Sequence, residues 1–160
     1  MTTGAGAPLL QNVKIDHITA VSLRSMLALG NPKSNPKMPN FTFTNNITNA
    51  GPAPLIVAQG GSTECTYHVG NIDMLNACFS NYQFSHNVII APPKASPPGQ
   101  WPDGNFFPGS VAGVHFQSAV ASLSANYTLL PSSPYKNAGT DGKDLGADIA
   151  ALQAAIASAE

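Results

Sequence analysis

The feature that most constrains this chain is a short segment that occurs three times. The copies are residues 12–19, 40–47 and 81–88, and each opens with Asn, carries large apolar residues at its second and fourth positions, and has Asn or His at its sixth. Alternation over so short a run is typical of a strand with one buried face. The copies begin 28 and 41 residues apart, which is close to the period of stacked supersecondary repeats. We therefore expect the three segments to lie one over another.

The equivalent positions of the copies are expected to form columns. The apolar positions should form one continuous interior, made of Val13, Ile15, Phe41, Phe43, Tyr82 and Phe84. The sixth positions, His17, Asn45 and His86, should form a ladder on the turns. An Asn separates the two histidines in that ladder, which argues against a metal site built from them.

Composition limits the classes of protein to which the chain can belong. Its 160 residues are 43% hydrophobic, enough for one substantial core, so a single domain over residues 1–160 is predicted. Only 9% are charged and the formal net charge is −1, so nothing indicates a basic surface for nucleic acid. No stretch is long and apolar enough to span a membrane. The first residues also lack the charged and apolar regions of a signal peptide, which is typical of a mature chain or an excised segment.

The rest of the chain divides around the repeats. Residues 1–11 read as a flexible lead-in and 12–130 as the repeated coils, interrupted by loops at 31–39, 60–80 and 92–110. Residues 144–160 change to a helical period, with Ile149, Leu152 and Ile156 on one face. Asp144 or Asp148 can cap or favourably charge the start of this helix. We expect the helix to cover an otherwise open core.

The two cysteines, Cys65 and Cys78, lie in a segment rich in small polar residues. A disulfide between them would close a short loop and stabilise the fold by roughly 3 kcal/mol. Two buried free thiols are the alternative, and a metal site is disfavoured because neither Cys has a Cys or His at finger-like spacing. The disulfide would indicate an oxidising, extracellular compartment.

The repeated segments resemble the rungs of right-handed parallel β-helix proteins of the pectin-lyase-like superfamily. The likeness covers nearly everything from Gln11 onward, and residues 133–148 are similar to the last coil of many secreted bacterial members. The resemblance implies an all-β, single-stranded solenoid with a C-terminal capping helix. It says little about activity, because one fold hosts many functions.

The same resemblance implies that further coils would normally precede the first repeat. The N-terminal rung would then be open, and an unpaired strand edge invites pairing with another chain. The chain is therefore predicted to form homo-oligomers or filaments through stacked coils, unless an N-terminal part has been removed.

Ile15-Asp16-His17 is similar to a stretch of pectate-lyase-type enzymes whose Asp helps hold Ca²⁺ against the substrate. Calcium requires several oxygen ligands, and the equivalent positions of the other copies are the uncharged Thr44 and Ser85. Asp16 is thus a weak candidate metal ligand, and with Arg24, Lys33 and Lys37 it makes a weak candidate catalytic set. The alternative is that Asp16 is a solvated turn residue and that His17 belongs to the turn ladder.

Three aromatic residues outside the repeats, Trp101, Tyr67 and Phe106, are weak candidates for contact with a glycan. A flat apolar ring suits the C–H face of a sugar, although packing of their loops against the body is the commoner use.

The function predicted from the sequence is a non-catalytic extracellular structural or interaction module, without catalytic residues or a cofactor. The alternative is a polysaccharide-binding or lyase-like protein that acts on uronate-containing glycans, for which Ca²⁺ would be needed. A lyase should gather its carboxylates on one face, whereas the eight acidic residues here are scattered along the sequence.

Overall fold

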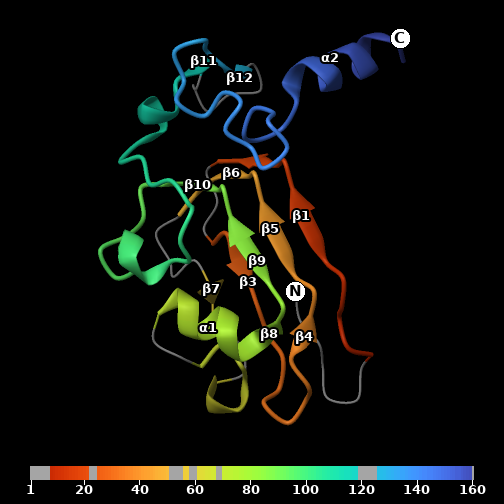
Figure 1. Ribbon diagram of the computed structural model, residues 1–160, viewed down its shortest axis with the longest axis vertical. Coiled ribbons are helices and arrows are strands. Elements are labelled where there is room, and N and C mark those ends of the chain that lie inside the picture. The colour runs from red at the N-terminus through yellow and green to blue at the C-terminus, as the bar shows by residue number, and fades with distance from the viewer. Residues whose placement is uncertain are drawn as a thin grey trace.

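The computed structural model describes residues 8–21, 25–50, 56–57, 61–67, 70–118 and 126–159. Two three-stranded parallel sheets dominate it (Figure 1). The first joins β1 (Lys14–Asp16), β5 (Thr42–Thr44) and β9 (Gln83–Ser85). The second joins β2 (Thr19–Ala20), β6 (Ile47–Asn49) and β10 (Val88–Ile90). Each repeat thus supplies a strand to both sheets.

The remaining strands form three pairs. Two are parallel, β3 (Leu27–Ala28) with β7 (Ile56–Val57) and β4 (Met38–Pro39) with β8 (Phe79–Ser80). The third is antiparallel, β11 (Phe116–Ser118) with β12 (Asn126–Leu129).

The helices are α1 (Asn71–Cys78) and α2 (Ile149–Ala157), with single 3-10 turns at Gly61–Thr63, Pro98–Gln100 and Val111–Val114. No helix in the described ranges is long and apolar enough to cross a bilayer.

The predicted alignment of the three repeats is confirmed. Ile15 pairs with Phe43, and Phe43 with Phe84, in parallel register. The Phe43 and Phe84 rings stack with centroids 5.0 Å apart, and Trp101 continues the stack beyond Phe84 at 5.7 Å. Burial of Phe41, Phe43 and Phe84 in one cluster provides the hydrophobic stabilisation of this region.

The prediction of an all-β right-handed parallel β-helix is wrong. The described strands belong to several small parallel and antiparallel sheets, α1 is inserted between β7 and β8, and nothing in the described ranges closes into a solenoid. The fold is mixed α/β. The repeats predict how neighbouring strands pair. Closure of a coil depends instead on the segments that connect the strands, and the connecting residues 60–80 and 92–110 share no repeated pattern. The predicted single domain over residues 1–160 and its internal boundaries stay predictions.

Asn and His recur in the repeats because the backbone turns there into the left-handed region. The first positions, Asn12, Asn40 and Asn81, have φ of 55° to 57°, and the sixth positions, His17, Asn45 and His86, have φ of 51° to 58°. Asn and His adopt this conformation more readily than other side chains with a Cβ. These two left-handed residues per repeat bend the chain before and after each strand of the first sheet.

The C-terminal helix forms as predicted but does not cover the core. Asp148 caps α2 by accepting a hydrogen bond from the Ala151 N–H at 2.9 Å. The helix buries none of its residues, and Leu152 and Ile156 are 54% and 55% exposed. In Figure 1 it projects from the end of the molecule that carries β11 and β12. The core is instead closed at that end by β11, β12, Tyr135 and Leu145.

Candidate functional site

A ladder of buried Asn side chains fixes the turns between the two sheets. Asn46 donates to Asn87 Oδ1 at 3.0 Å, and Asn87 donates to Asn105 Oδ1 at 3.0 Å. The same amides bond the main chain of neighbouring turns, as Asn87 Nδ2 does to the Phe43 carbonyl at 2.8 Å. Asn46 and Asn87 are 1% and 0% exposed. The ladder is therefore structural and has no free polar group to offer a ligand.

Two of the three sixth-position residues, His17 and Asn45, contact a distant segment of the chain. Asn45 accepts a hydrogen bond from the Thr140 N–H and donates one to Thr140 Oγ1, both at 2.9 Å. The Asn45 carbonyl accepts from the Gly146 N–H at 2.7 Å, and His17 Nδ1 lies 3.1 Å from the Gly146 carbonyl. Residues 136–148, which we call the C-terminal loop, are thus fastened over the turns of the first two repeats.

A Cβ at Gly146 would collide with Thr19 and Ile47, and its φ is +80°. Only glycine lets the C-terminal loop approach the turns so closely.

Acidic residues of the C-terminal loop lie close to His17. His17, Lys143, Asp144 and Asp148 line a cleft of about 420 Å³, and Asp141 Oδ2 lies 3.3 Å from His17 Nε2. That separation suits an ion pair with protonated His, although its angles are not those of a hydrogen bond. Lys136 Nζ contacts Asp144 at 2.6 Å. Asp141 and Asp144 therefore each have a basic neighbour.

The pKa values of the acids agree with a structural role. Burial raises the pKa of Asp144, but the Lys136 ammonium and the Asn137 N–H outweigh it and hold the pKa below its ordinary 3.8. Burial also opposes ionisation of Asp16, yet Lys14, Thr44 and Asn45 lower its pKa below the usual value. For Asp141 the Lys143 N–H contributes most to a lowered pKa. A general acid or base near neutral pH needs a pKa shifted the other way.

The structure does not bring the candidate lyase residues together. Asp16 lies on β1 and is bonded by Lys14, Thr44 and Asn45. Lys33 and Lys37 line a different cleft beside the disulfide, and Arg24 lies outside the described residues. No group of three or more His, Cys, Asp or Glu in the described part of the chain is placed to hold a metal ion.

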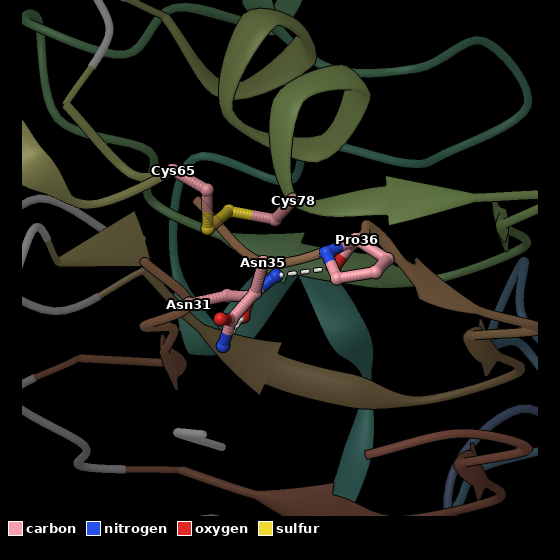
Figure 2. The surroundings of a disulfide bond; sticks show 5 residues. All are labelled: Asn31, Asn35, Pro36, Cys65 and Cys78. Atoms are coloured by element: carbon pink, nitrogen blue, oxygen red, sulfur yellow. Dashed lines mark hydrogen bonds between the residues drawn. A yellow bond between two sulfur atoms is a disulfide. The ribbon is translucent and has the colours of Figure 1, made fainter. Parts of the chain in front are cut away.

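The disulfide between Cys65 and Cys78 is confirmed, with Cα atoms 5.0 Å apart. It joins the end of α1 to the segment that follows η1 (Gly61–Thr63), above Asn31 and Asn35 (Figure 2). Asn31 accepts from the Cys65 N–H through its carbonyl and donates from its amide to the Pro36 carbonyl, both at 2.9 Å. The disulfide therefore fixes the loop of residues 31–39 against α1.

A cleft of about 520 Å³ lies beside this disulfide and is lined by Lys33, Lys37, Asn35 and Ala77, among others. Lys33 Nζ lies 5.3 Å from the ring centroid of Tyr67. Tyr67 is 56% exposed, so one aromatic face and two ammonium groups meet at this part of the surface. We call it the lysine cleft.

The other aromatic candidates are packed against the body of the protein. Trp101 is 2% exposed and donates its indole N–H to the Ser96 carbonyl at 3.3 Å, so it is not available to a glycan. Phe106 is half-buried and packs edge-on against Tyr135. Of the three, Tyr67 alone presents a large exposed surface.

The outer edge of β1 has no strand partner among the described residues. The Thr42 N–H bonds the Val13 carbonyl at 2.8 Å and the His17 N–H bonds the Thr44 carbonyl at 3.4 Å. In a parallel ladder this alternation turns the main-chain groups of Ile15 toward β5 and those of Lys14 and Asp16 away from it. No described residue bonds these outward groups of Lys14 and Asp16. In Figure 1, β1 lies at the side of its sheet.

The opposite edge of the same sheet is covered. The His86 N–H bonds the Gly104 carbonyl at 2.6 Å, and Asn105 Nδ2 donates to the Phe84 carbonyl at 3.1 Å. The second sheet is covered likewise, where Ile89 N–H bonds the Phe106 carbonyl at 2.8 Å. The two edges of the repeat stack therefore differ.

An apolar groove of about 210 Å³ lies at the open end, between the first and second repeats. Its lining is mainly hydrophobic and consists of Ile15, Ile18, Ala20, Met26, Leu27, Phe43, Asn46, Ile47 and Thr48. Ile18 is 45% exposed. The open edge of β1 and this groove together form what we call the β1 surface.

Comparison with known proteins does not place the chain in a family. No protein-family model, no curated protein and no solved structure matches it. The resemblance to the pectin-lyase-like superfamily therefore stays a prediction from the sequence.

Sequence reasoning missed the part played by the C-terminal loop. The run Thr140-Asp141-Gly142-Lys143-Asp144 reads as an ordinary turn, and its hydrogen bonds reach a residue 95 positions away. Such contacts use one amide, one hydroxyl and backbone groups, which leave no periodic signal. The glycine at 146, which has a positive φ, is a local sign of a close approach.

Proposed function

We propose that this chain is a non-catalytic extracellular interaction module that associates with itself through the β1 surface. The observation that carries the proposal is the open edge of β1, where the main-chain groups of Lys14 and Asp16 have no described partner. An exposed edge is a ready template for another strand. The apolar groove beside it would give such pairing a hydrophobic component.

A non-catalytic role is supported by the state of the ionisable groups. Asp16, Asp141 and Asp144 each have a basic neighbour and a lowered pKa. They are therefore ionised and engaged in contacts within the fold at neutral pH. An extracellular location is supported by the Cys65–Cys78 disulfide, because such bonds persist in oxidising compartments.

The edge is tested by two substitutions at one position. Lys14→Pro removes the outward N–H while leaving the bonds of Ile15 to β5, whereas Lys14→Ala keeps that N–H. We expect the wild-type chain to self-associate in analytical ultracentrifugation. Lys14→Pro should weaken association at least tenfold and Lys14→Ala only a few-fold, with unchanged circular dichroism. A wild-type chain that stays monomeric at high concentration would contradict the proposal.

A second function, binding of a uronate-containing glycan, is supported by the lysine cleft. Lys33 and Lys37 can pair with sugar carboxylates, and the exposed ring of Tyr67 can stack on a sugar face. Catalysis is not part of this proposal.

Titration with oligogalacturonate, followed by calorimetry, tests the second function. We expect Lys33→Ala with Lys37→Ala to weaken binding about tenfold or more, and Tyr67→Ala to weaken binding of both charged and neutral oligosaccharides. Lys94→Ala, an exposed lysine outside the cleft, is the matched control and should bind as wild type. Equal loss with Lys94→Ala would mean nonspecific attraction between charges.

A further inference from the structure

The partner and register of the β1 surface can be derived from its own residues. We propose that two copies of this chain pair their β1 strands in antiparallel fashion about a two-fold axis at Ile15, with Lys14 of each copy opposite Asp16 of the other. This inference rests on the proposed function, since it requires association through the β1 surface.

The direction of the main-chain groups of β1 favours this register. Lys14 and Asp16 are two positions apart and both direct N–H and C=O groups away from β5. In an antiparallel ladder, residues directly opposite each other at hydrogen-bonded positions exchange both of these bonds. Placing Lys14 opposite Asp16 of the second copy therefore satisfies every outward group of both strands. Ile15 then lies opposite its own copy at the non-hydrogen-bonded position.

The charge pattern of the β1 edge favours the same register. Opposite residues in an antiparallel pair have their side chains on the same face, where opposite charges attract and like charges repel. Lys14 Nζ lies 2.9 Å from Asp16 Oδ2 within one chain, and the Lys14 side chain is 66% exposed. In the proposed register each Lys meets an Asp across the interface. A parallel, in-register pair would instead set Lys against Lys and Asp against Asp.

The position of the apolar groove favours the two-fold arrangement. A two-fold axis perpendicular to the sheet keeps the interior faces of both copies on the same side. The two grooves, each with a 45% exposed Ile18, would then face each other across the axis. Pairing would remove apolar surface of both copies from water. Stacking of β1 onto the far edge of a second copy is disfavoured, because Gly104 and Asn105 already occupy that edge.

The test uses charge reversal on one exposed side chain. Lys14→Glu makes the edge wholly acidic and should raise the dissociation constant of the dimer at least tenfold, measured by sedimentation equilibrium. Lys94→Glu changes the net charge by the same amount at an exposed site away from β1, and should leave the dimer unchanged. Asp16→Lys makes the edge wholly basic and should also give monomers.

Mixing is the decisive measurement. Lys14→Glu and Asp16→Lys chains, each monomeric alone, should form a one-to-one heterodimer when combined, because every opposite pair then carries opposite charges. Asp16 also accepts hydrogen bonds from Thr44 and Asn45, so the fold of the Asp16→Lys variant is checked by circular dichroism. If that variant does not fold, comparison of Lys14→Glu with its control Lys94→Glu still tests the register.

The outcomes separate this inference from the proposed function. A wild-type dimer that Lys14→Glu weakens no more than Lys94→Glu, or folded variants that fail to combine, would overturn the register while leaving self-association in place. A wild-type chain that is monomeric throughout would overturn both. An assembly larger than a dimer would overturn the two-fold arrangement.

Discussion

At the scale of single residues, Asn has two different structural roles in this fold. At Asn12, Asn40 and Asn81 it adopts a left-handed backbone conformation that most side chains disfavour. At Asn46 and Asn87 its amide is buried and bonds both the backbone and the next amide in the ladder. An amide suits the second task because it donates and accepts at the same time.

Asn87→Ala should be among the most destabilising substitutions in the chain. It removes the acceptor of the Asn46 N–H and the donor to the Phe43 carbonyl, and both groups are buried. Leaving buried groups without partners costs about 1–3 kcal/mol each, so we expect a loss of about 3 kcal/mol or more in urea unfolding. Asn76→Ala is the control, because Asn76 is exposed and accepts only from the Tyr82 hydroxyl. A loss below about 1 kcal/mol for Asn87→Ala would show that the ladder is dispensable.

At the scale of elements, the two helices differ in how far they are integrated into the core. The disulfide holds α1 against the loop of residues 31–39. Three residues of α1, Met74, Leu75 and Cys78, also lie in the larger hydrophobic cluster. The helix α2 buries none of its residues. Its helical period and its cap at Asp148 are local properties, so they could be predicted, whereas its position could not.

Removal of α2 should therefore change stability little. We expect a chain that ends at Asp148 to keep its melting temperature within about 2 °C, since few apolar contacts are lost. Leu145→Ala is the comparison, because Leu145 is 1% exposed in the second hydrophobic cluster, and it should cost about 2–5 kcal/mol. A large drop in melting temperature on removing α2 would restore the idea of a helical cap.

At the scale of the whole molecule, the sequence predicts what is local and periodic. The register of Ile15, Phe43 and Phe84 follows from alternation within each copy, and the left-handed turns follow from Asn and His at fixed positions. The disulfide follows from two cysteines in a segment without other support. Each of these signals is carried by residues close together in the chain or identical between copies.

What could not be predicted depends on aperiodic connections. The repeated segments contain no sequence pattern that indicates the antiparallel pair of β11 and β12 or the insertion of α1. The solenoid prediction was wrong for this reason. At the lysine cleft, Lys33 meets Tyr67 in a region that the disulfide holds together. Trp101 is buried because its loop folds back onto Phe84, which composition alone does not reveal.

The attachment of the C-terminal loop also governs when this protein can become native during synthesis. Asn45 bonds Thr140 and His17 contacts Gly146, so the turns that follow β1 and β5 cannot acquire these partners until nearly the last part of this sequence has left the ribosome. Contacts over so long a separation slow the search for the native state. Nascent chains should therefore leave the turns at His17 and Asn45 without their final partners for most of translation.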